Sequence, residues 1–247
     1  MIRLVRFCET LLFFRSPPVR LMLSTLAVLI PLSCVSTLNA EEKFKPIFDG
    51  KTLDGWEGNP NLWSVEDGAI TGVTTDDDPI KANTFLVWKG TAANFVLKLD
   101  FKTSKVGNSG VQYRSKVLDK EKFIVGGYQA DIDPSMKFAG INYEEKGRGI
   151  LATRGQRVVL SDDEDPKVEQ FGKADELAKK IKQSDWNSYR IVANGRKLSH
   201  YINGELMSEV VDNSKKKFAE KGVIALQLHR GPAMTIQFKN LTLKELK

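Results

Sequence analysis

The sequence is nearly free of cysteine. Only Cys8 and Cys34 occur among its 247 residues, and both fall within the first forty. Without those forty residues, no thiol is left for a disulfide, a zinc–thiolate centre or a cysteine nucleophile. The rest of the chain must therefore be held together by its apolar core, and it is long enough to form one.

Histidine is scarce, and the common cofactor motifs are missing. The two histidines are His200 and His229. There is no G-x-G-x-x-G, no P-loop, no H-E-x-x-H and no internal repeat. These absences remove the usual sequence signatures of dinucleotide binding, nucleoside triphosphate binding and zinc proteolysis. A single domain over residues 41–247 is the economical interpretation.

Long apolar runs are also missing, with one exception near the start. Four arginines precede the run Leu21–Val35, and the small residue Ala40 stands before Glu41 and Glu42. This order is typical of a secretory signal peptide. The run has about 15 residues, fewer than the roughly 20 of a spanning helix. We expect cleavage near Ala40 and an exported mature protein, periplasmic or extracellular, without a membrane span. An uncleaved anchor and a start at Met22 are the alternatives.

The net charge is modest once this leader is set aside. The chain has 37 Lys and Arg residues against 31 Asp and Glu residues. Four of the former and one of the latter lie in residues 1–40, which leaves 33 against 30 and lowers the net charge from +6 to +3. The pI of about 9.1 thus owes much to the leader. Because the sequence has no basic stripe with interleaved aromatic residues, we expect no nucleic-acid partner.

Short alternating runs separated by turn residues dominate residues 41–247. Residues 94–103 alternate apolar and polar side chains, as in a half-buried strand. Asn194-Gly195 and Asn203-Gly204 separate the runs 189–193, 197–202 and 206–211, and Asn-Gly between such runs is typical of β-hairpins. Only residues 174–182 predict a helix. We therefore expect an all-β sandwich or jelly roll of two antiparallel sheets with one short helix.

Three of these runs carry polar side chains on one face. The run 126–133 turns Gln129, Asp131 and Asp133 away from its apolar face. The other two runs contribute further polar groups: Gln112 and Arg114 from 111–115, and Gln227 and His229 from 225–229. Amide, carboxylate and guanidinium groups form paired hydrogen bonds with sugar hydroxyls. We expect one open sugar-binding groove. The alternative is the solvated outer face of a sheet, but Lys is scarce in these rows.

Several motifs resemble the 3-keto-disaccharide hydrolase family, formerly a domain of unknown function. They span nearly all of residues 44–247. The segments are Ile-Phe-Asp-Gly-Lys-Thr-Leu-Asp-Gly-Trp at 47–56, Gly-Asn-Ser-Gly-Val-Gln-Tyr-Arg-Ser at 107–115, Gly-Tyr-Gln-Ala-Asp-Ile at 127–132, Gly-Arg-Gly-Ile-Leu-Ala-Thr-Arg-Gly-Gln at 147–156, Asp-Trp-Asn-Ser-Tyr-Arg-Ile-Val-Ala at 185–193 and Leu-Gln-Leu-His-Arg-Gly-Pro at 226–232.

The resemblance implies a concanavalin-like β-sandwich in an exported bacterial protein that acts on sugars, with the groove on its concave sheet. Arg114, Gln129, Asp131, Gln227 and His229 fall within the family motifs. Related glucanases of this fold carry Glu-x-Asp-x-x-Glu on their catalytic strand. Here the comparable positions begin with Gln129, which cannot act as a carboxylate nucleophile.

A 3-keto sugar offers a different route, because the ketone acidifies the proton on C2. A base removes that proton, the glycosidic oxygen leaves C1, and water adds to the enone. We expect Asp131 and His229 to transfer protons and Arg114 to hold the enolate or the substrate. The remaining predicted substrate-binding residues are Gln112, Gln129, Gln227 and Glu144. No cofactor is certain, but a divalent metal ion held by Asp131, His229 and Glu144 is the alternative to Arg114.

Two functions remain open from the sequence. The first is an exported hydrolase or lyase that cleaves the glycosidic bonds of 3-keto-glycosides. The second is a non-catalytic carbohydrate-binding module of the same fold. The expected partner of both is an oligosaccharide or glycoside.

Overall fold

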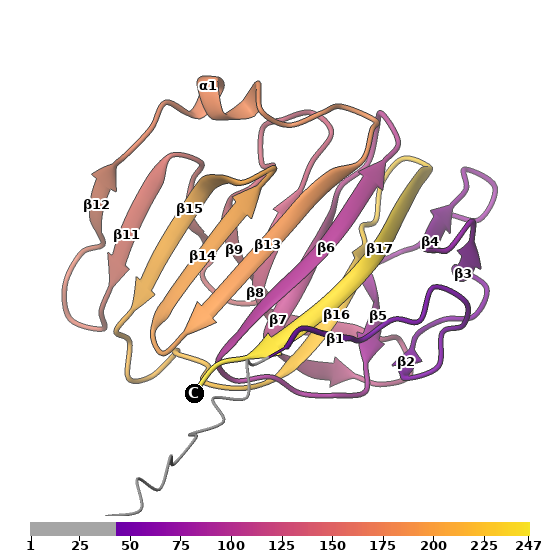
Figure 1. The fold of residues 1–247 in the computed structure, drawn as a ribbon, viewed down its shortest axis with the longest axis horizontal. Helices are drawn as coiled ribbons and strands as arrows, with labels where there is room; N and C mark the ends of the chain where they lie inside the picture. The colour runs from indigo at the N-terminus through magenta and orange to yellow at the C-terminus, as the bar shows by residue number, and fades with distance from the viewer. Residues whose placement is uncertain (1–42) are drawn as a thin grey trace, which may run out of the picture. The chain divides into compact units, whose positions relative to one another are not determined.

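Strands in which apolar and polar residues alternate form the two sheets of the fold (Figure 1). The computed structural model describes residues 43–247, and the predicted signal peptide lies outside the described residues. The predicted β-sandwich class is confirmed, since the described residues form a ten-stranded sheet and a seven-stranded sheet with one short helix, α1 (Ala174–Ala178). No helix of this part is long and apolar enough to cross a bilayer.

The larger sheet is built around the predicted three-strand meander. Its strands are β1 (Lys45–Pro46), β3 (Trp63–Glu66), β4 (Ala69–Thr74), β6 (Phe95–Thr103), β11 (Gln156–Leu160), β12 (Lys167–Gln170), β13 (Asn187–Asn194), β14 (Lys197–Ile202), β15 (Glu205–Asp212) and β17 (Met234–Glu245). Their order is β12-β11-β15-β14-β13-β6-β17-β4-β3, and β1 pairs with β17. The pairing of β11 with β15 is parallel, whereas the remaining pairs of this sheet are antiparallel.

The smaller sheet carries the strands with polar rows. Its strands are β2 (Trp56–Glu57), β5 (Thr84–Trp88), β7 (Ser109–Asp119), β8 (Ile124–Ile132), β9 (Asn142–Glu145), β10 (Gly149–Ala152) and β16 (Val223–Leu228). Their order is β10-β9-β8-β7-β16-β5-β2. The three strands expected to share a groove, β8, β7 and β16, are therefore direct neighbours.

The two sheets meet through the inward side chains of their alternating strands. The four apolar positions of β6 predicted to point inward are all buried. From the facing sheet, Tyr113 and Tyr128 stack with ring centroids 5.7 Å apart, and Phe95 meets Tyr113 edge-on at 6.1 Å. Such aromatic pairs contribute about 0.5–1.5 kcal/mol beyond the area they bury. The core thus fixes the smaller sheet against the larger one.

The structure has strands between residues 142 and 170 that the sequence does not predict. These strands are β9, β11 and β12. β12 is exposed along its whole length, so it lacks the apolar alternation that marks a strand. The predicted helix 174–182 shortens to α1. Residues 234–245 form the single strand β17, with a register shift near Asn240, which has a φ of 56°.

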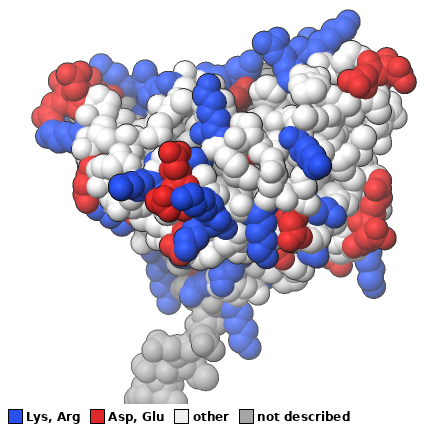
Figure 2. Space-filling model, turned by 90° about the horizontal axis from the view of Figure 1, so that it is seen from above, with Lys and Arg blue, Asp and Glu red and all other residues white. Residues whose placement is uncertain are grey.

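Charged side chains of both signs are interspersed on the face shown in Figure 2, with uncharged surface between them. This face has no continuous stripe of one sign. An extended polyanion would therefore meet acidic side chains along with basic ones there.

A β-bulge in β7 turns Arg114 out of the strand alternation. The register with β8 shifts between Tyr113 and Lys116, and Arg114 has a φ of 48°. Its side chain is buried and donates to the backbone oxygens of Ala93 at 2.7 Å and Gly195 at 2.8 Å. Arg114 therefore joins the segment before β6 to the turn between β13 and β14.

Replacing Arg114 with lysine should destabilise the fold. A single ammonium group cannot reproduce the forked contacts, so buried carbonyl oxygens lose their donors, at about 1–3 kcal/mol each. We expect Arg114→Lys to lower the free energy of unfolding in urea by about 2 kcal/mol or more. Arg230→Lys, at an exposed position, should change it by less than about 0.5 kcal/mol. Equal effects of the two substitutions would contradict the structural role of Arg114.

Candidate active site

A pocket of about 720 Å³ opens on the face of the seven-stranded sheet that points away from the core. Strands β8 and β16 provide its floor, β9 provides one wall, and the segments before β5 and β7 complete it. The polar and charged residues that line it are Lys81, Asn83, Asn108, Gln129, Asp131, Asp133, Ser135, Tyr143, Glu145, Lys146, Gln227, His229 and Arg230. The polar rows of β8 and β16 thus meet in one cavity.

The alternation of β8 puts the core and the pocket on opposite faces of one strand. Tyr128 and Ala130 join the hydrophobic core, whereas Gln129 and Asp131 line the pocket. Gly110 of β7 lies opposite Asp131. A Cβ atom at Gly110 would lie 2.6 Å from Cδ of Gln129. The absence of a side chain at Gly110 therefore leaves the space that Gln129 occupies.

A series of hydrogen bonds runs from β7 to β8 and ends on Asp131. The hydroxyl of Ser115 donates to Gln112 Oε1 at 2.6 Å, and Gln112 Nε2 donates to Gln129 Oε1 at 2.8 Å. Gln129 Nε2 then donates to Asp131 Oδ1 at 2.6 Å. All four side chains are buried. Each amide accepts through its oxygen and donates through its nitrogen. The hydrogen bonds therefore all run in one direction, from Ser115 to Asp131.

Gln227 borders the same floor with an unused donor. It is fully buried on β16, and its Oε1 lies 3.5 Å from Gln129 Nε2. Its own Nε2 has no hydrogen-bond partner among the described residues. A buried donor without a partner costs about 1–3 kcal/mol. An acceptor oxygen of a ligand in the pocket would remove that cost.

Asp131 is a buried acid of the pocket with a raised pKa. Burial raises the pKa of its carboxyl to about 8, the negative charges of Asp133 and Glu145 act in the same direction, and the hydrogen bond from Gln129 opposes them. Oδ1 accepts the Gln129 hydrogen, so Oδ2 is the oxygen left to carry the carboxyl proton. At neutral pH Asp131 is mostly a neutral acid that can still ionise.

The neighbouring acids have different surroundings. Asp133 accepts hydrogen bonds from the backbone nitrogens of Ser135 and Phe138, both at 2.8 Å, so it holds the loop after β8. Glu145 on β9 accepts a long hydrogen bond of 3.4 Å from Asn83 Nδ2. These charges strengthen the preference of Asp131 for its neutral form.

His229 follows β16 directly and is only partly buried. Its Nδ1 lies 2.5 Å from the backbone oxygen of Arg230. Since a carbonyl oxygen only accepts, Nδ1 must carry a hydrogen in this contact, and Nε2 of the neutral ring keeps its lone pair. The imidazole is thereby oriented as a base. The other histidine, His200, is fully buried between the sheets, where desolvation lowers its pKa to about 3.

Two residues predicted on the groove face do not line the pocket. Arg114 points the other way because the bulge shifts the strand register, and its guanidinium is occupied by backbone oxygens. The expected place of Arg114 beside the substrate is therefore wrong. Gln112 is buried beside Gln129, its partner on the neighbouring strand, so it supports the pocket without lining it.

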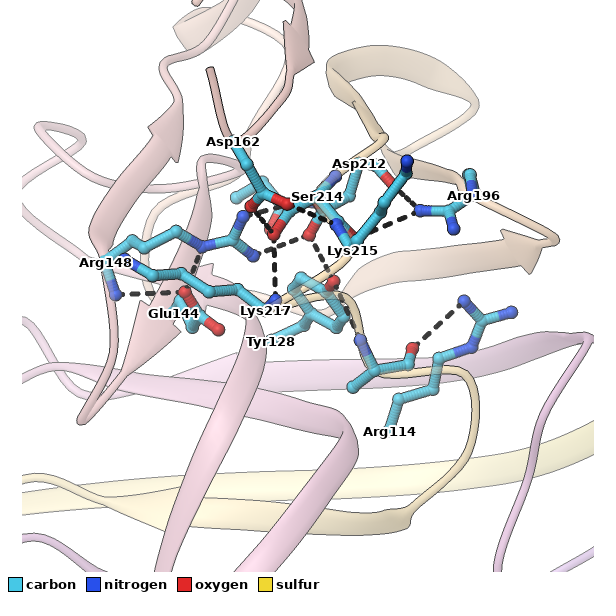
Figure 3. A network of polar contacts seen from close by, with 12 residues as sticks. Arg114, Tyr128, Glu144, Arg148, Asp162, Arg196, Asp212, Ser214, Lys215 and Lys217 are labelled. Atoms are coloured by element: carbon cyan, nitrogen blue, oxygen red, sulfur yellow. Dashed lines mark hydrogen bonds and ion pairs between the residues drawn. The ribbon is translucent and has the colours of Figure 1, made fainter. Parts of the chain in front are cut away.

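Glu144 also faces away from the pocket. It accepts a hydrogen bond from Nε of Arg148 at 2.5 Å, and Nη2 of Arg148 donates to Oδ2 of Asp212 at 2.6 Å (Figure 3). The expected metal site of Asp131, His229 and Glu144 is therefore not assembled, since Glu144 lies on the opposite face of β9. Within residues 43–247 no group of three His, Cys, Asp or Glu side chains is placed to hold a metal ion.

The sequence prediction missed the residues that β9 contributes. Tyr143 pairs with Gln129 across the sheet, and Glu145 pairs with Gly127. Both therefore share the pocket face with Gln129. A shift of one residue along a strand moves a side chain to the other face. The alternation of Tyr143 and Glu145 was the available signal, but it is short and lies in a segment without an apolar pattern.

Comparisons with known proteins agree with this architecture. The profile of the 3-keto-alpha-glucoside-1,2-lyase-like domain matches residues 43–244. A 3-keto-disaccharide hydrolase of Bacteroides thetaiotaomicron is 38% identical over 88 residues, and this alignment covers 31% of the present chain and 29% of that relative. The chain thus spans less than a third of the curated relative that it matches.

Solved structures share the fold at low sequence identity. A putative glycosyl hydrolase from Parabacteroides distasonis has a TM-score of 0.55 at 24% identity, over 83% of this chain and all of that one. The carbohydrate-binding module CBM66 from Bacillus subtilis has a TM-score of 0.52 at 14% identity, over 77% of this chain and 96% of that one. These similarities establish the fold.

Replacing Asp131 with asparagine should stabilise the protein, and more so at alkaline pH. In the folded protein the carboxyl has a pKa of about 8, whereas in the unfolded chain its pKa is near 3.8. The folded state thus binds more protons in this window, so the contribution of Asp131 to stability falls as pH rises from about 4 to 8. An amide cannot ionise and escapes this loss. We expect the melting temperature of Asp131→Asn to exceed that of the parent increasingly across the window, by about 2–4 °C for each kcal/mol.

Asp163→Asn is the matched control, since Asp163 is exposed in the loop after β11. As an exposed loop substitution, it should leave the melting temperature close to that of the parent. If the advantage of Asp131→Asn shrank as pH rose, the raised pKa of Asp131 would be refuted.

Proposed function

The chain belongs to the 3-keto-alpha-glucoside-1,2-lyase-like family, whose profile matches it over most of its length, and we propose that it cleaves the glycosidic bond of 3-keto-glycosides. The observation that carries this proposal is the buried carboxyl of Asp131 on the pocket floor, with a pKa of about 8. General acids work best when their pKa lies near the operating pH. Sugar binding alone gives no reason to bury an ionisable acid in this way.

The chemistry starts from the ketone at C3 of the sugar. A base removes the proton on C2, and the electron pair moves into the enolate. The C1–oxygen bond then breaks, the leaving oxygen takes a proton, and an enone remains. Addition of water, with hydroxyl to C1 and a proton to C2, completes net hydrolysis. If the enone is released before water adds, the same active site acts as a lyase.

We assign the base role to His229 and the acid role to Asp131. The hydrogen bond at Nδ1 leaves Nε2 of His229 free to accept the C2 proton. Asp131 is mostly protonated at neutral pH and holds its proton on Oδ2, because Oδ1 accepts the hydrogen of Gln129. It can therefore protonate the leaving oxygen. Both residues line the same pocket.

Gln227 takes over the role that the sequence suggested for Arg114. A ketone oxygen only accepts hydrogen bonds, and its negative charge grows as the enolate forms. The unpaired Nε2 of Gln227 matches this need for a donor. The hydrogen bond becomes stronger in the transition state, which is where a donor accelerates the reaction.

Substitution of either proton-transfer residue should strongly reduce cleavage. With a 3-keto-glucoside as substrate and released aglycone as the readout, we expect Asp131→Asn and His229→Ala each to lower kcat/KM by about 100-fold or more. The parent enzyme should lose activity as pH rises through about 8, because Asp131 then gives up its proton.

Asp163→Asn should retain the activity of the parent in this assay. Binding of the 3-keto-glucoside without any turnover would instead assign the pocket to a non-catalytic carbohydrate-binding module. If activity instead rose as the pH passed through 8, Asp131 would be the base and His229 the acid.

Replacing Gln227 with methionine should reduce activity without reducing stability. The substitution removes a buried donor that has no partner in the free protein, so we expect the urea midpoint to stay the same or rise. Loss of one donor at an oxyanion lowers kcat by about 10²–10³-fold. Wild-type kcat in Gln227→Met would show that the ketone oxygen lies elsewhere.

A further inference from the structure

We propose that Gln112, which lies beside Gln129 on the neighbouring strand β7, is a positioning residue that fixes the direction of the Gln129 amide and thereby keeps the acid proton of Asp131 on its pocket side. The inference rests on the proposed function only for the use made of that proton. Gln112 is not among the residues that line the pocket, so its effect must pass through Gln129.

The structure shows one orientation of Gln112. Its Oε1 accepts from the Ser115 hydroxyl at 2.6 Å, and its Nε2 donates to Gln129 Oε1 at 2.8 Å. The Ser115 hydroxyl also lies 3.0 Å from the backbone oxygen of Tyr113, so it is Gln112, and not Ser115, that presents a donor to Gln129. Both glutamines are shielded from solvent, with 0% and 2% exposure, so water cannot compensate for a mismatched amide. With its oxygen on Gln112, Gln129 turns its nitrogen to Asp131.

The opposite direction would have a different chemical result. If Gln129 presented its oxygen, the only way to satisfy both groups would be for Asp131 to donate its own proton to Gln129. The acid proton would then point into the sheet and away from the substrate. In the observed direction Oδ1 of Asp131 is an acceptor, and the proton is left to Oδ2. The amide hydrogen bond also supports the ionised form that remains after the proton is transferred.

Other groups near Asp131 also affect its titration and must stay unchanged in a test. Asp133 lies just after the end of β8, Glu145 and Tyr143 come from β9, and Tyr189 of β13 donates to the backbone oxygen of Asp131 at 3.3 Å. The remaining titratable or charged groups of the pocket are Lys81, Lys146, His229 and Arg230. Within residues 43–247 the Gln112 side chain is hydrogen-bonded to Gln129 and Ser115 and to none of these groups, so a substitution there acts on Asp131 through the Gln129 amide.

The test measures the titration of Asp131 itself and needs no substrate. Aspartate labelled with ¹³C at Cγ is incorporated into the full chain, and Asp131→Asn identifies the Asp131 signal. Gln112→Met removes the donor to Gln129 Oε1, so the Gln129 amide loses its fixed direction. We expect the Asp131 midpoint to rise by about 0.5–1 pH unit, the size of one neutral hydrogen bond. Ser115→Ala, which removes only the first link, should give a smaller rise and serves if Gln112→Met fails to fold.

Gln227→Met is the matched control, because it places the same side chain on the other neighbour of Gln129. It removes an acceptor of Gln129 Nε2, which leaves that nitrogen to Asp131. The Asp131 midpoint should therefore not rise. An equal rise in both methionine variants would assign the effect to altered packing and overturn the proposal, as would an unchanged midpoint in Gln112→Met and Ser115→Ala.

The kinetic readout then separates the two proposals. In Gln112→Met the alkaline decline of kcat/KM should move with the Asp131 midpoint, and kcat should fall more than KM changes. If the midpoint moves but the parent chain cleaves no 3-keto-glucoside, Gln112 still positions Gln129 and the proposed function fails. If cleavage occurs but its alkaline decline stays fixed while the midpoint moves, Gln112 does not control the reacting proton.

Discussion

The pairing of β8 with strands on both sides is the constraint on which the rest of the structure depends. Because side chains alternate across a strand, the same register that puts Tyr128 and Ala130 into the core puts Gln129 and Asp131 into the pocket. Any slip of one residue would bury the acid in the apolar core. The apolar face of β8 therefore determines where the chemistry lies, although none of its side chains touches the pocket.

The buried polar side chains of the pocket floor lower the stability of the free protein. Asp131 loses its hydration without gaining a cation, and Gln227 keeps an unused donor. Both features are unfavourable in the free protein, and a ligand with a carbonyl oxygen and a basic leaving oxygen would relieve both. The larger sheet and the buried contacts of Arg114 supply the rigidity against which this floor is held.

The sequence pattern predicts the floor of the site better than its walls. β8 and β16 are regular through their polar rows, so alternation places Gln129, Asp131 and Gln227 correctly. It fails for Arg114 because a bulge inserts a residue with positive φ. It fails for Glu144 because β9 is too short and too polar to be predicted as a strand. The hydrogen bond between Ser115 and Gln112 could not be predicted from alternation either. The same bulge turns Ser115 to the side of the strand on which Gln112 lies.

An amide at position 129 changes what a single neighbouring acid can do. A carboxylate there would place a second negative charge beside Asp131 and supply the nucleophile of a double displacement. Gln129 adds no charge, and it can accept from Gln112 while it donates to Asp131. Such a residue cannot attack an anomeric carbon, but it can hold one proton in a defined place. A reaction that begins at an acidic C–H bond next to a ketone needs that control of protons more than it needs a nucleophile.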